Sequence, residues 1–537
     1  LKEWGEVFQA LPRVDAVFVP GGDPGHTRPK VLFDLLEKQA ANLKKYHPKA
    51  AMWMSPQSFT APWMEEFFEL VRREPAWLAG VVYGPQIRVP LPKLRAALPQ
   101  KIPIRDYPDI THSRQCQYPV PDWDVAFALT EGREVSNPRP VQTARMFRYG
   151  RPSTVGFITY SEGCHDDVNK AVWSALGWDD KADVKDVLRQ YGRYFIGPAL
   201  GDRFADGLLA LEKNWEGPVL ENAGIGATLK HFQAMERDAG PREKLNWRFQ
   251  QALYRAYYDA HVWARLKQET SAMDAALCEL RAAKTNGALK AIADAETILD
   301  RAAKEPAAPE LRARMDVLAE ALFQSIRAQL SVTKYHGMSG RGNSLDTADV
   351  PLTDVAWLRA EMAAAAKLPD EAARIARLDA ALNRTAPGPG GFYDDFGDPK
   401  RQPHLVRDPG WEKDPGFDVS PQTAFSMRTN FPRAWWHYAE THYETPLRAK
   451  YDGLDPSASY RVRVVYGTQE GRKVRLTAGE GHEVHGFLAK PFEPVEFDIP
   501  AAATAGGKLT LTWTPEPGAG GPGRGCQVCE VWVLKRP

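Results

Sequence analysis

The sequence lacks two features that indicate partners of a particular class: a net charge and a long apolar run. Lys plus Arg total 69 and Asp plus Glu total 68, which leaves a formal net charge of +1. Such a balance provides little electrostatic attraction for nucleic acid or for an anionic membrane surface. No run of about 18 apolar residues occurs, so no membrane span is expected. Neither nucleic acid nor a membrane is therefore an expected partner.

Cysteine is also scarce. The five cysteines are Cys116, Cys164, Cys278, Cys526 and Cys529. An odd and sparse set is not a disulfide framework. Cys526 and Cys529 form a CxxC pair, but this pair lies in a strand-like run and no second pair completes a zinc site. We expect buried thiols there, and we expect no metal and no other cofactor.

The chain has neither a starting methionine nor a signal peptide. It begins at Leu1 and enters a helix-like segment, residues 4–11, almost at once. We expect the beginning of the natural protein to lie upstream of this point.

Large aromatic residues, in contrast, are abundant, with 16 Trp and 18 Tyr in 537 residues. Flat aromatic faces stack on sugar rings, so this composition is typical of a saccharide-binding protein. The alternative is that large domains bury many aromatic side chains in their cores. The length itself suggests about three domains.

Residues 1–178 alternate between short apolar runs and amphipathic helical stretches, which is typical of βα units. Helices are predicted at 29–46 and 62–73. Strands are predicted at 16–19, 50–54, 80–83, 102–105 and 155–160. Five units do not close a (β/α)₈ barrel, so a TIM-like fold requires three earlier strands that this chain lacks. A doubly wound sheet is the alternative, but no Gly-x-Gly-x-x-Gly turn follows the first strand.

The rest of the chain predicts two further domains. Residues 179–385 have the 3.6-residue periodicity of helices and predict an α-helical domain. Within it, the glycine-punctuated segment 335–343 either reaches a neighbouring active site or is a simple turn. Residues 386–537 alternate at period two and predict an antiparallel β-sandwich. This sandwich is expected either to bind carbohydrate or to pack against its neighbours.

Reactive residues of a (β/α)₈ barrel follow its strands, and the segment after the first predicted strand resembles a known family. Gly21-Gly22-Asp23 resembles the Gly-Gly-Asp-Glu segment on the fourth barrel strand of β-hexosaminidases. The following helix and the Trp-bearing strand at 52–54 resemble the next unit of that family. This resemblance implies a barrel glycosidase in which Asp23 orients the acetamido group of an N-acetylated sugar.

The sequence departs from that family at Pro24, which occupies the place of the general acid. Because a proline cannot protonate a leaving group, the family's substrate-assisted mechanism does not carry over whole. The predicted series of barrel, helices and sandwich also resembles exo-acting α-glucuronidases and α-N-acetylglucosaminidases in architecture, without a shared motif.

Three carboxylates are the expected catalytic groups: Asp23, Asp109 and Glu162. Glu162 directly follows the fifth predicted strand. Asp109 lies in a connection of more than 40 residues between the fourth and fifth strands, and long loops in compact domains are usually functional. Glycoside hydrolysis needs two such groups, one as acid and one as base or nucleophile. Their separation is not given by the sequence, so retaining and inverting outcomes remain open.

Other side chains at the strand ends are expected to bind substrate. Amides and imidazoles suit hydroxyl groups, and His26 and His112 are expected to position hydroxyls or tune pKa values. Arginine holds carboxylates, which indicates an acidic sugar such as a uronic or sialic acid. The alternative is that these groups shape loops or, for Asp166, cap a helix. The expected binding residues are His26, Gln57, Tyr83, Gln86, Arg105, His112, Arg114, Tyr160 and Asp166.

The sequence thus predicts an exo-acting glycoside hydrolase whose partner is an oligo- or polysaccharide. A non-catalytic glycan-binding protein on a degenerate barrel is the alternative that Pro24 suggests. A third hypothesis is a metal-dependent hydrolase built on His26, His112 and Asp166. A glycan substrate favours a periplasmic or secreted location. No feature indicates the oligomeric state.

Overall fold

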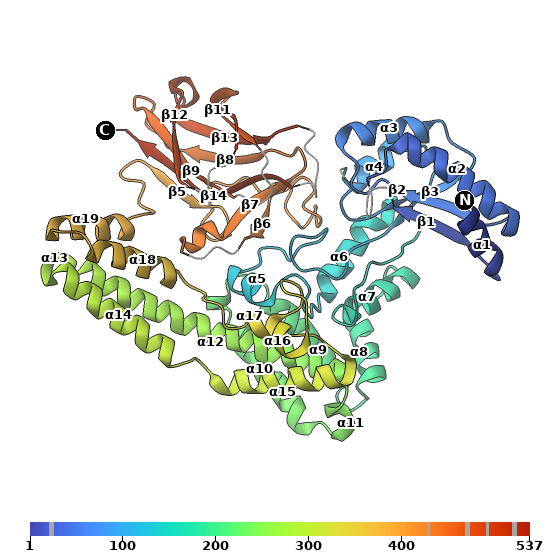
Figure 1. The fold of residues 1–537 in the computed structure, drawn as a ribbon, viewed down its shortest axis with the longest axis horizontal. Helices are drawn as coiled ribbons and strands as arrows, with labels where there is room; N and C mark the ends of the chain where they lie inside the picture. Colours follow the sequence, from blue (N-terminus) through green and yellow to red (C-terminus); the bar gives the residue numbers. More distant parts are fainter. Residues whose placement is uncertain are drawn as a thin grey trace.

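The computed structural model of this chain describes residues 1–20, 26–87, 89–426, 430–467, 473–489, 493–517 and 524–536. Figure 1 shows a small parallel sheet near the N-terminus, a large set of helices, and antiparallel sheets near the C-terminus. Among the described helices, none combines the length and the apolar character that crossing a membrane requires.

The N-terminal sheet has four parallel strands in chain order, so the loops that follow them all leave from the same edge of the sheet. Its strands are β1 (Ala16–Pro20), β2 (Ala51–Ser55), β3 (Leu78–Tyr83) and β4 (Ile104–Asp106). Its helices are α1 (Lys2–Ala10), α2 (Pro29–Tyr46), α3 (Ala61–Arg72) and α4 (Leu91–Ala97). The predicted helices and the first four predicted strands are thus present, to within two residues at each end.

The fifth predicted strand, 155–160, is not a continuous strand. It makes two isolated parallel bridges, Asp106 to Phe157 and Asp109 to Tyr160. The amide of Tyr160 donates to the carbonyl of Pro108 at 2.9 Å, but Pro108 has no N–H to donate in return. The ladder is therefore interrupted, although the segment still runs beside β4. No further described strand joins this sheet, which is open in the described part of the chain, and a closed barrel stays a prediction.

Residues after β4 pack with the helices rather than with the sheet. Ile110, Trp123 and Trp173 belong to one buried cluster with Trp215 and Tyr254, whereas the cluster around the sheet ends at Ile104. The loop that follows β4 is consequently anchored on the helical part of the molecule. These buried tryptophans also match the alternative interpretation of the aromatic composition, namely burial in a core.

The helical region is built around α12 (Trp247–Arg281), which contacts α10, α14 and α15. Asn246 caps its first turn, since its side chain accepts a hydrogen bond from the amide of Arg248 at 2.9 Å. The other helices are α5 (Val125–Glu131), α6 (Pro140–Gly150), α7 (Asp167–Trp178), α8 (Val184–Phe195), α9 (Gly201–Asn214), α10 (Gly224–Asp238), α11 (Pro241–Lys244), α13 (Ala283–Asn286), α14 (Ala288–Lys304), α15 (Pro309–Ile326), α16 (Val332–Tyr335), α17 (Ser344–Thr347), α18 (Val355–Ala366) and α19 (Glu371–Leu382).

The C-terminal β region consists of two antiparallel sheets, in the orders β11-β10-β13-β8 and β12-β9-β14-β7-β6, with β5 paired to β14. Side chains of both sheets, among them Leu476, Trp513 and Val531, share one buried cluster, as in a β-sandwich. Cys526 and Cys529 are buried, as expected. The strands are β5 (Phe392–Asp395), β6 (Gln422–Phe425), β7 (His437–His442), β8 (Leu447–Asp452), β9 (Tyr460–Tyr466), β10 (Val474–Ala478), β11 (His482–Leu488), β12 (Val495–Ile499), β13 (Lys508–Pro515) and β14 (Arg524–Lys535).

Candidate active site

The loop after β4 holds a buried aspartate–histidine pair. Oδ1 of Asp109 accepts hydrogen bonds from the amides of Thr111 at 3.1 Å and His112 at 3.2 Å, which turns the chain back on itself. Oδ2 of Asp109 lies 2.7 Å from Nδ1 of His112, and both residues are 3% exposed. Burial by itself would raise the pKa of Asp109, but the hydrogen bonds and charge of His112 bring that pKa below its usual value.

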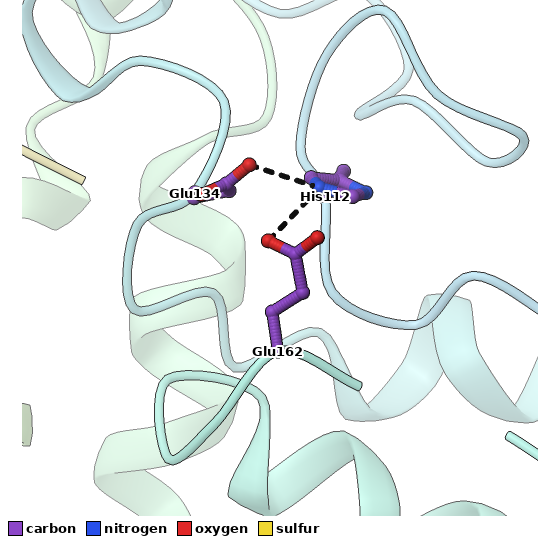
Figure 2. A group of neighbouring side chains, drawn as sticks. All are labelled: His112, Glu134 and Glu162. Carbon is purple, nitrogen blue, oxygen red and sulfur yellow. Dashed lines mark hydrogen bonds and ion pairs between the residues drawn. The ribbon is translucent and has the colours of Figure 1, made fainter. Parts of the chain in front are cut away.

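The same geometry orients the other ring nitrogen. Because an ionised carboxylate only accepts hydrogen bonds, the proton between Asp109 and His112 belongs to Nδ1. Nε2 of His112 then faces two carboxylates, with Oε1 of Glu134 at 3.2 Å and Oε2 of Glu162 at 3.5 Å (Figure 2). Glu134 is largely buried, whereas the Glu162 side chain is 28% exposed. Three loops therefore converge on one small cluster.

Tyr160 covers one face of this cluster. Its ring stacks on the His112 ring, with centroids 5.7 Å apart and an interplanar angle of 26°. Its hydroxyl donates a hydrogen bond to Glu162. Burial and the neighbouring Glu162 carboxylate raise the pKa of Tyr160, so the phenol remains a donor. Of the residues expected from the sequence, Asp109, His112, Tyr160 and Glu162 are thus brought together.

The helical region completes the cluster through Arg341. The guanidinium of Arg341 contacts the carboxylate of Glu134 and lies 3.9 Å from that of Glu162. The glycine-punctuated segment 335–343 therefore reaches the site, which is one of its two predicted interpretations. Glu134 and Arg341 are not among the residues expected from the sequence. Glu134 lies in the long connection after β4, and the only signal at Arg341 is the glycines around it.

A buried polar framework supports the loops. Asp166, 1% exposed at the N-terminus of α7, accepts hydrogen bonds from Thr111 and from Ser161, the latter at 3.0 Å, and pairs with Lys170 at 3.1 Å. Its side chain makes no capping hydrogen bond within α7. Arg139, 1% exposed, donates to the carbonyls of His112 at 3.1 Å and Tyr118 at 2.9 Å. Arg139 thus holds the backbone of the site directly, and Asp166 holds it through the side chains of Thr111 and Ser161.

The remaining expected residues lie outside this cluster. Asp23 and Pro24 lie outside the described residues, and His26 is exposed. The amide of Gln57 donates to the carbonyl of Pro85 at 3.1 Å, the loop-shaping role considered from the sequence. Arg105 lies over the ring of Trp53 at 4.2 Å.

Tyr83 and Gln86 lie with Asp109 and Arg133 around a cavity of about 140 Å³ beside the cluster. Residues of the C-terminal β region complete its wall. Arg114 is partly buried near Arg133 and Arg524. Burial is the main cause that lowers its pKa, and the charges of these two arginines lower it further. The cavity and the cluster share Asp109, and Arg133 lies 3.7 Å from Glu134, so the two are neighbours.

Imidazole and carboxylate groups are also metal ligands. Within the described ranges, the ligand atoms of His112, Glu134 and Glu162 lie within 4.8 Å of one another, a donor set that suits a divalent cation. The Arg341 guanidinium already supplies positive charge at Glu134. The metal set considered from the sequence, His26, His112 and Asp166, shares only His112 with this donor set. Asp166 instead bonds Thr111 and Ser161, and His26 is exposed.

No protein-family model matches this chain, and no curated protein matches it. Solved structures similar to it over most of its length are glycoside hydrolases. One is a family GH115 4-O-methyl-α-glucuronidase with specificity for decorated arabinogalactans, with 8% identity, a TM-score of 0.34, and 95% of this chain and 61% of that chain covered. Another is a GH138 enzyme targeting pectin rhamnogalacturonan II, with 7% identity and a TM-score of 0.36. The match covers 97% of this chain and 74% of that chain.

A β-glucuronidase of Bacteroides uniformis is similar over a shorter part, with 8% identity, a TM-score of 0.19, and 27% of this chain and 18% of that chain covered. The chain spans about three fifths of the length of the GH115 glucuronidase. All three TM-scores are below 0.5, and these similarities identify no family for the chain.

Proposed function

We propose that the protein is an exo-acting glycoside hydrolase whose catalytic pair is Glu162 and Glu134. The observation that carries this proposal is the approach of the two carboxylates, whose facing oxygens lie within 4.8 Å of each other. Retaining glycosidases hold their two carboxyl groups about 5–5.5 Å apart, and inverting ones leave more room for a water molecule. Because this upper bound of 4.8 Å lies well below the spacing of inverting enzymes, we propose a retaining mechanism. Of the three carboxylates expected from the sequence, Glu162 keeps its catalytic role and Asp109 becomes the group that orients His112.

The surroundings of Glu134 suggest that it is the nucleophile and that Glu162 is the acid and base. Glu134 contacts Arg341 and lies near Arg133, and such donors stabilise an ionised carboxylate, which is the form a nucleophile needs. In the first step Glu134 bonds to the anomeric carbon, the glycosidic C–O bond breaks, and the proton of Glu162 passes to the leaving oxygen. In the second step Glu162 takes a proton from water, the water oxygen bonds to the anomeric carbon, and the bond to Glu134 breaks, which releases the sugar and restores both glutamates.

The proposed substrate class is an acidic sugar, with an N-acetylated sugar as the alternative that the Gly21-Gly22-Asp23 resemblance implies. Arg133 supports an acidic sugar because it lines the cavity beside the carboxylate pair, and Arg114 lies close to it. We further propose that the open parallel sheet is part of a TIM-like barrel. The chain order of four parallel strands plus the 155–160 segment supports this, because a doubly wound sheet reverses its order.

A panel of 4-nitrophenyl and alkyl glycosides, including uronides, sialosides and N-acetylhexosaminides, tests the proposal. Glu134→Gln should lose turnover on every substrate, by about 10³-fold or more, because no nucleophile remains. Glu162→Gln should lose about 10²- to 10⁴-fold in kcat/KM on alkyl glycosides but far less in kcat/KM on 4-nitrophenyl glycosides, whose leaving group needs no acid in the first step. Proton NMR of the first product formed should show the anomer of the substrate.

Glu310→Gln is the matched control, because Glu310 is exposed in the first turn of α15 and lies in neither the cluster nor the cavity. It should hydrolyse like the wild type. Full turnover in both Glu134→Gln and Glu162→Gln would remove the proposed pair. Binding of sugars without any turnover by the wild type would instead favour the non-catalytic glycan-binding alternative.

A further inference from the structure

The cavity beside the carboxylate cluster has two walls from distant parts of the chain. One wall comes from the loops after β3 and β4, including Tyr83, Gln86 and Gln117. The opposite wall comes from the C-terminal β region, including Gln422 at the start of β6 and Glu440 on β7. The volume between them is about 140 Å³. A water molecule in the liquid takes about 30 Å³, so the space holds more than a single water.

The amide of Gln422 is held in one orientation. The residue is 3% exposed, and its Nε2 lies 3.0 Å from Oε2 of Glu440 and 2.8 Å from Nε2 of His442. Because the carboxylate of Glu440 accepts hydrogen bonds, the NH₂ group must be the end that faces it. The carbonyl end, Oε1, is then left buried with no donor among the described residues. The C-terminal wall thus carries an unpaired acceptor.

Gln117 is held in the opposite sense. Its Oε1 accepts a hydrogen bond from the amide of Asp109 at 3.0 Å, so the carbonyl end faces the backbone. Its Nε2 is buried and has no acceptor within the described ranges. The loop wall thus carries an unpaired donor. Buried polar atoms are normally paired, and leaving one without a partner costs free energy.

Gln117 and Gln422 both line this polar cavity, and a ligand that both donates and accepts hydrogen bonds would match their unpaired ends. A hydroxyl group accepts one hydrogen bond and donates another, and a sugar ring presents several hydroxyls. The cavity adjoins Glu134 through Arg133 and adjoins His112 through Asp109. A sugar ring in the cavity would therefore lie next to the carboxylate pair.

We propose that this cavity is a sugar-binding subsite in which Gln117 Nε2 donates to, and Gln422 Oε1 accepts from, hydroxyls of the substrate. The C-terminal β region is then a wall of the active site rather than a separate binding module. That the ligand is a sugar rests on the proposed function. The unpaired amide ends of Gln117 and Gln422 do not depend on that proposal.

The test measures binding without turnover. In a Glu162→Gln background, saturation-transfer NMR and titration are carried out with the methyl glycosides of glucose, galactose, N-acetylglucosamine and glucuronic acid. At least one should bind, and Gln117→Leu and Gln422→Leu should each weaken its binding about tenfold, the loss expected for one hydrogen bond. Gln117→Met replaces Gln117→Leu if the latter does not fold.

Gln402→Leu is the matched control. Gln402 is 5% exposed in the C-terminal β region, and its Oε1 also has no donor among the described residues, but it does not line the cavity. This variant should bind the methyl glycoside like its parent. Unchanged binding in the Gln117 and Gln422 variants would overturn the inference, and so would the absence of binding by every glycoside. In either case the cavity would hold only water.

The outcomes separate the two proposals. If sugars bind through Gln117 and Gln422 but the wild type hydrolyses none, the subsite stands and the catalytic proposal fails. If hydrolysis depends on Glu162 and Glu134 while both glutamine variants keep the KM of the wild type, the catalytic proposal stands and the subsite fails.

Discussion

Gly342 and Glu134 approach so closely that a Cβ atom on Gly342 would lie 2.8 Å from the carbonyl oxygen of Glu134. On the facing side, Gly132 has φ +78°, and a Cβ there would lie 3.1 Å from the carbonyl oxygen of Arg341. Two glycines thus let the helical region lie directly against the loop of the active site. This contact is what brings the Arg341 guanidinium to the Glu134 carboxylate.

Gly342→Ala should therefore lower activity by displacing Arg341 rather than by unfolding the protein. The neighbouring atom is backbone and cannot rotate away, so the 335–343 segment must shift. We expect kcat to fall at least about tenfold with little change in KM, because a misplacement of about 1 Å disturbs catalytic positioning. Steady-state kinetics and a thermal melt measure the two effects. Gly506→Ala, where a Cβ meets no atom within 4 Å, should change neither.

Asp109→Asn should impair catalysis through His112. The asparagine is nearly isosteric, but it has no charge and its NH₂ end can donate, which would move the ring proton to Nε2. We expect kcat/KM to fall at least about tenfold. Nitrogen-15 NMR of the histidine rings should show the change of tautomer. An unchanged His112 spectrum together with unchanged kinetics would contradict the role assigned to Asp109.

Asp106→Asn should stabilise the protein at alkaline pH. Burial raises the pKa of Asp106 from 3.8 to about 7, and its Oδ1 has no hydrogen-bond partner in the described part of the chain. Between these values the folded state holds a proton that the unfolded state releases, so stability falls as pH rises from about 4 to 7. The asparagine removes this loss, which is on the order of a few kcal/mol. Its melting temperature should exceed that of the wild type more at pH 8 than at pH 5, and an equal difference at both would contradict the assignment.

Arg255→Met should strongly destabilise the helical region. Arg255 is 1% exposed and pairs with Asp259 at 3.0 Å and Glu131 at 3.4 Å, both of them buried. Burial raises the pKa of Glu131, and the charge of Arg255 opposes that shift. Removing one partner of a buried ion pair costs about 3–5 kcal/mol. Urea unfolding should show this loss for Arg255→Met but not for Arg301→Met, an exposed position on α14.

The sequence by itself determined the local elements. Apolar periodicity and turn residues predicted β1 to β4, the helices α2 and α3, the helical region and the antiparallel strands after residue 386, because these patterns depend on neighbours in the chain. It also predicted that Asp109, His112, Tyr160 and Glu162 belong to one site, since each follows a strand whose end lies at the same edge of the sheet. Closure of the barrel and the role of Asp23 stay predictions.

Only the tertiary structure decided which groups complete the site. Glu134 and Arg341 are separated by more than 200 positions, and their contact depends on how α5 and the 335–343 segment pack against α12. Gln117 and Gln422 likewise line one cavity only because the C-terminal β region lies against the loops after β3 and β4. Pairings of this kind arise from the docking of separate cores, and no spacing along the chain encodes them.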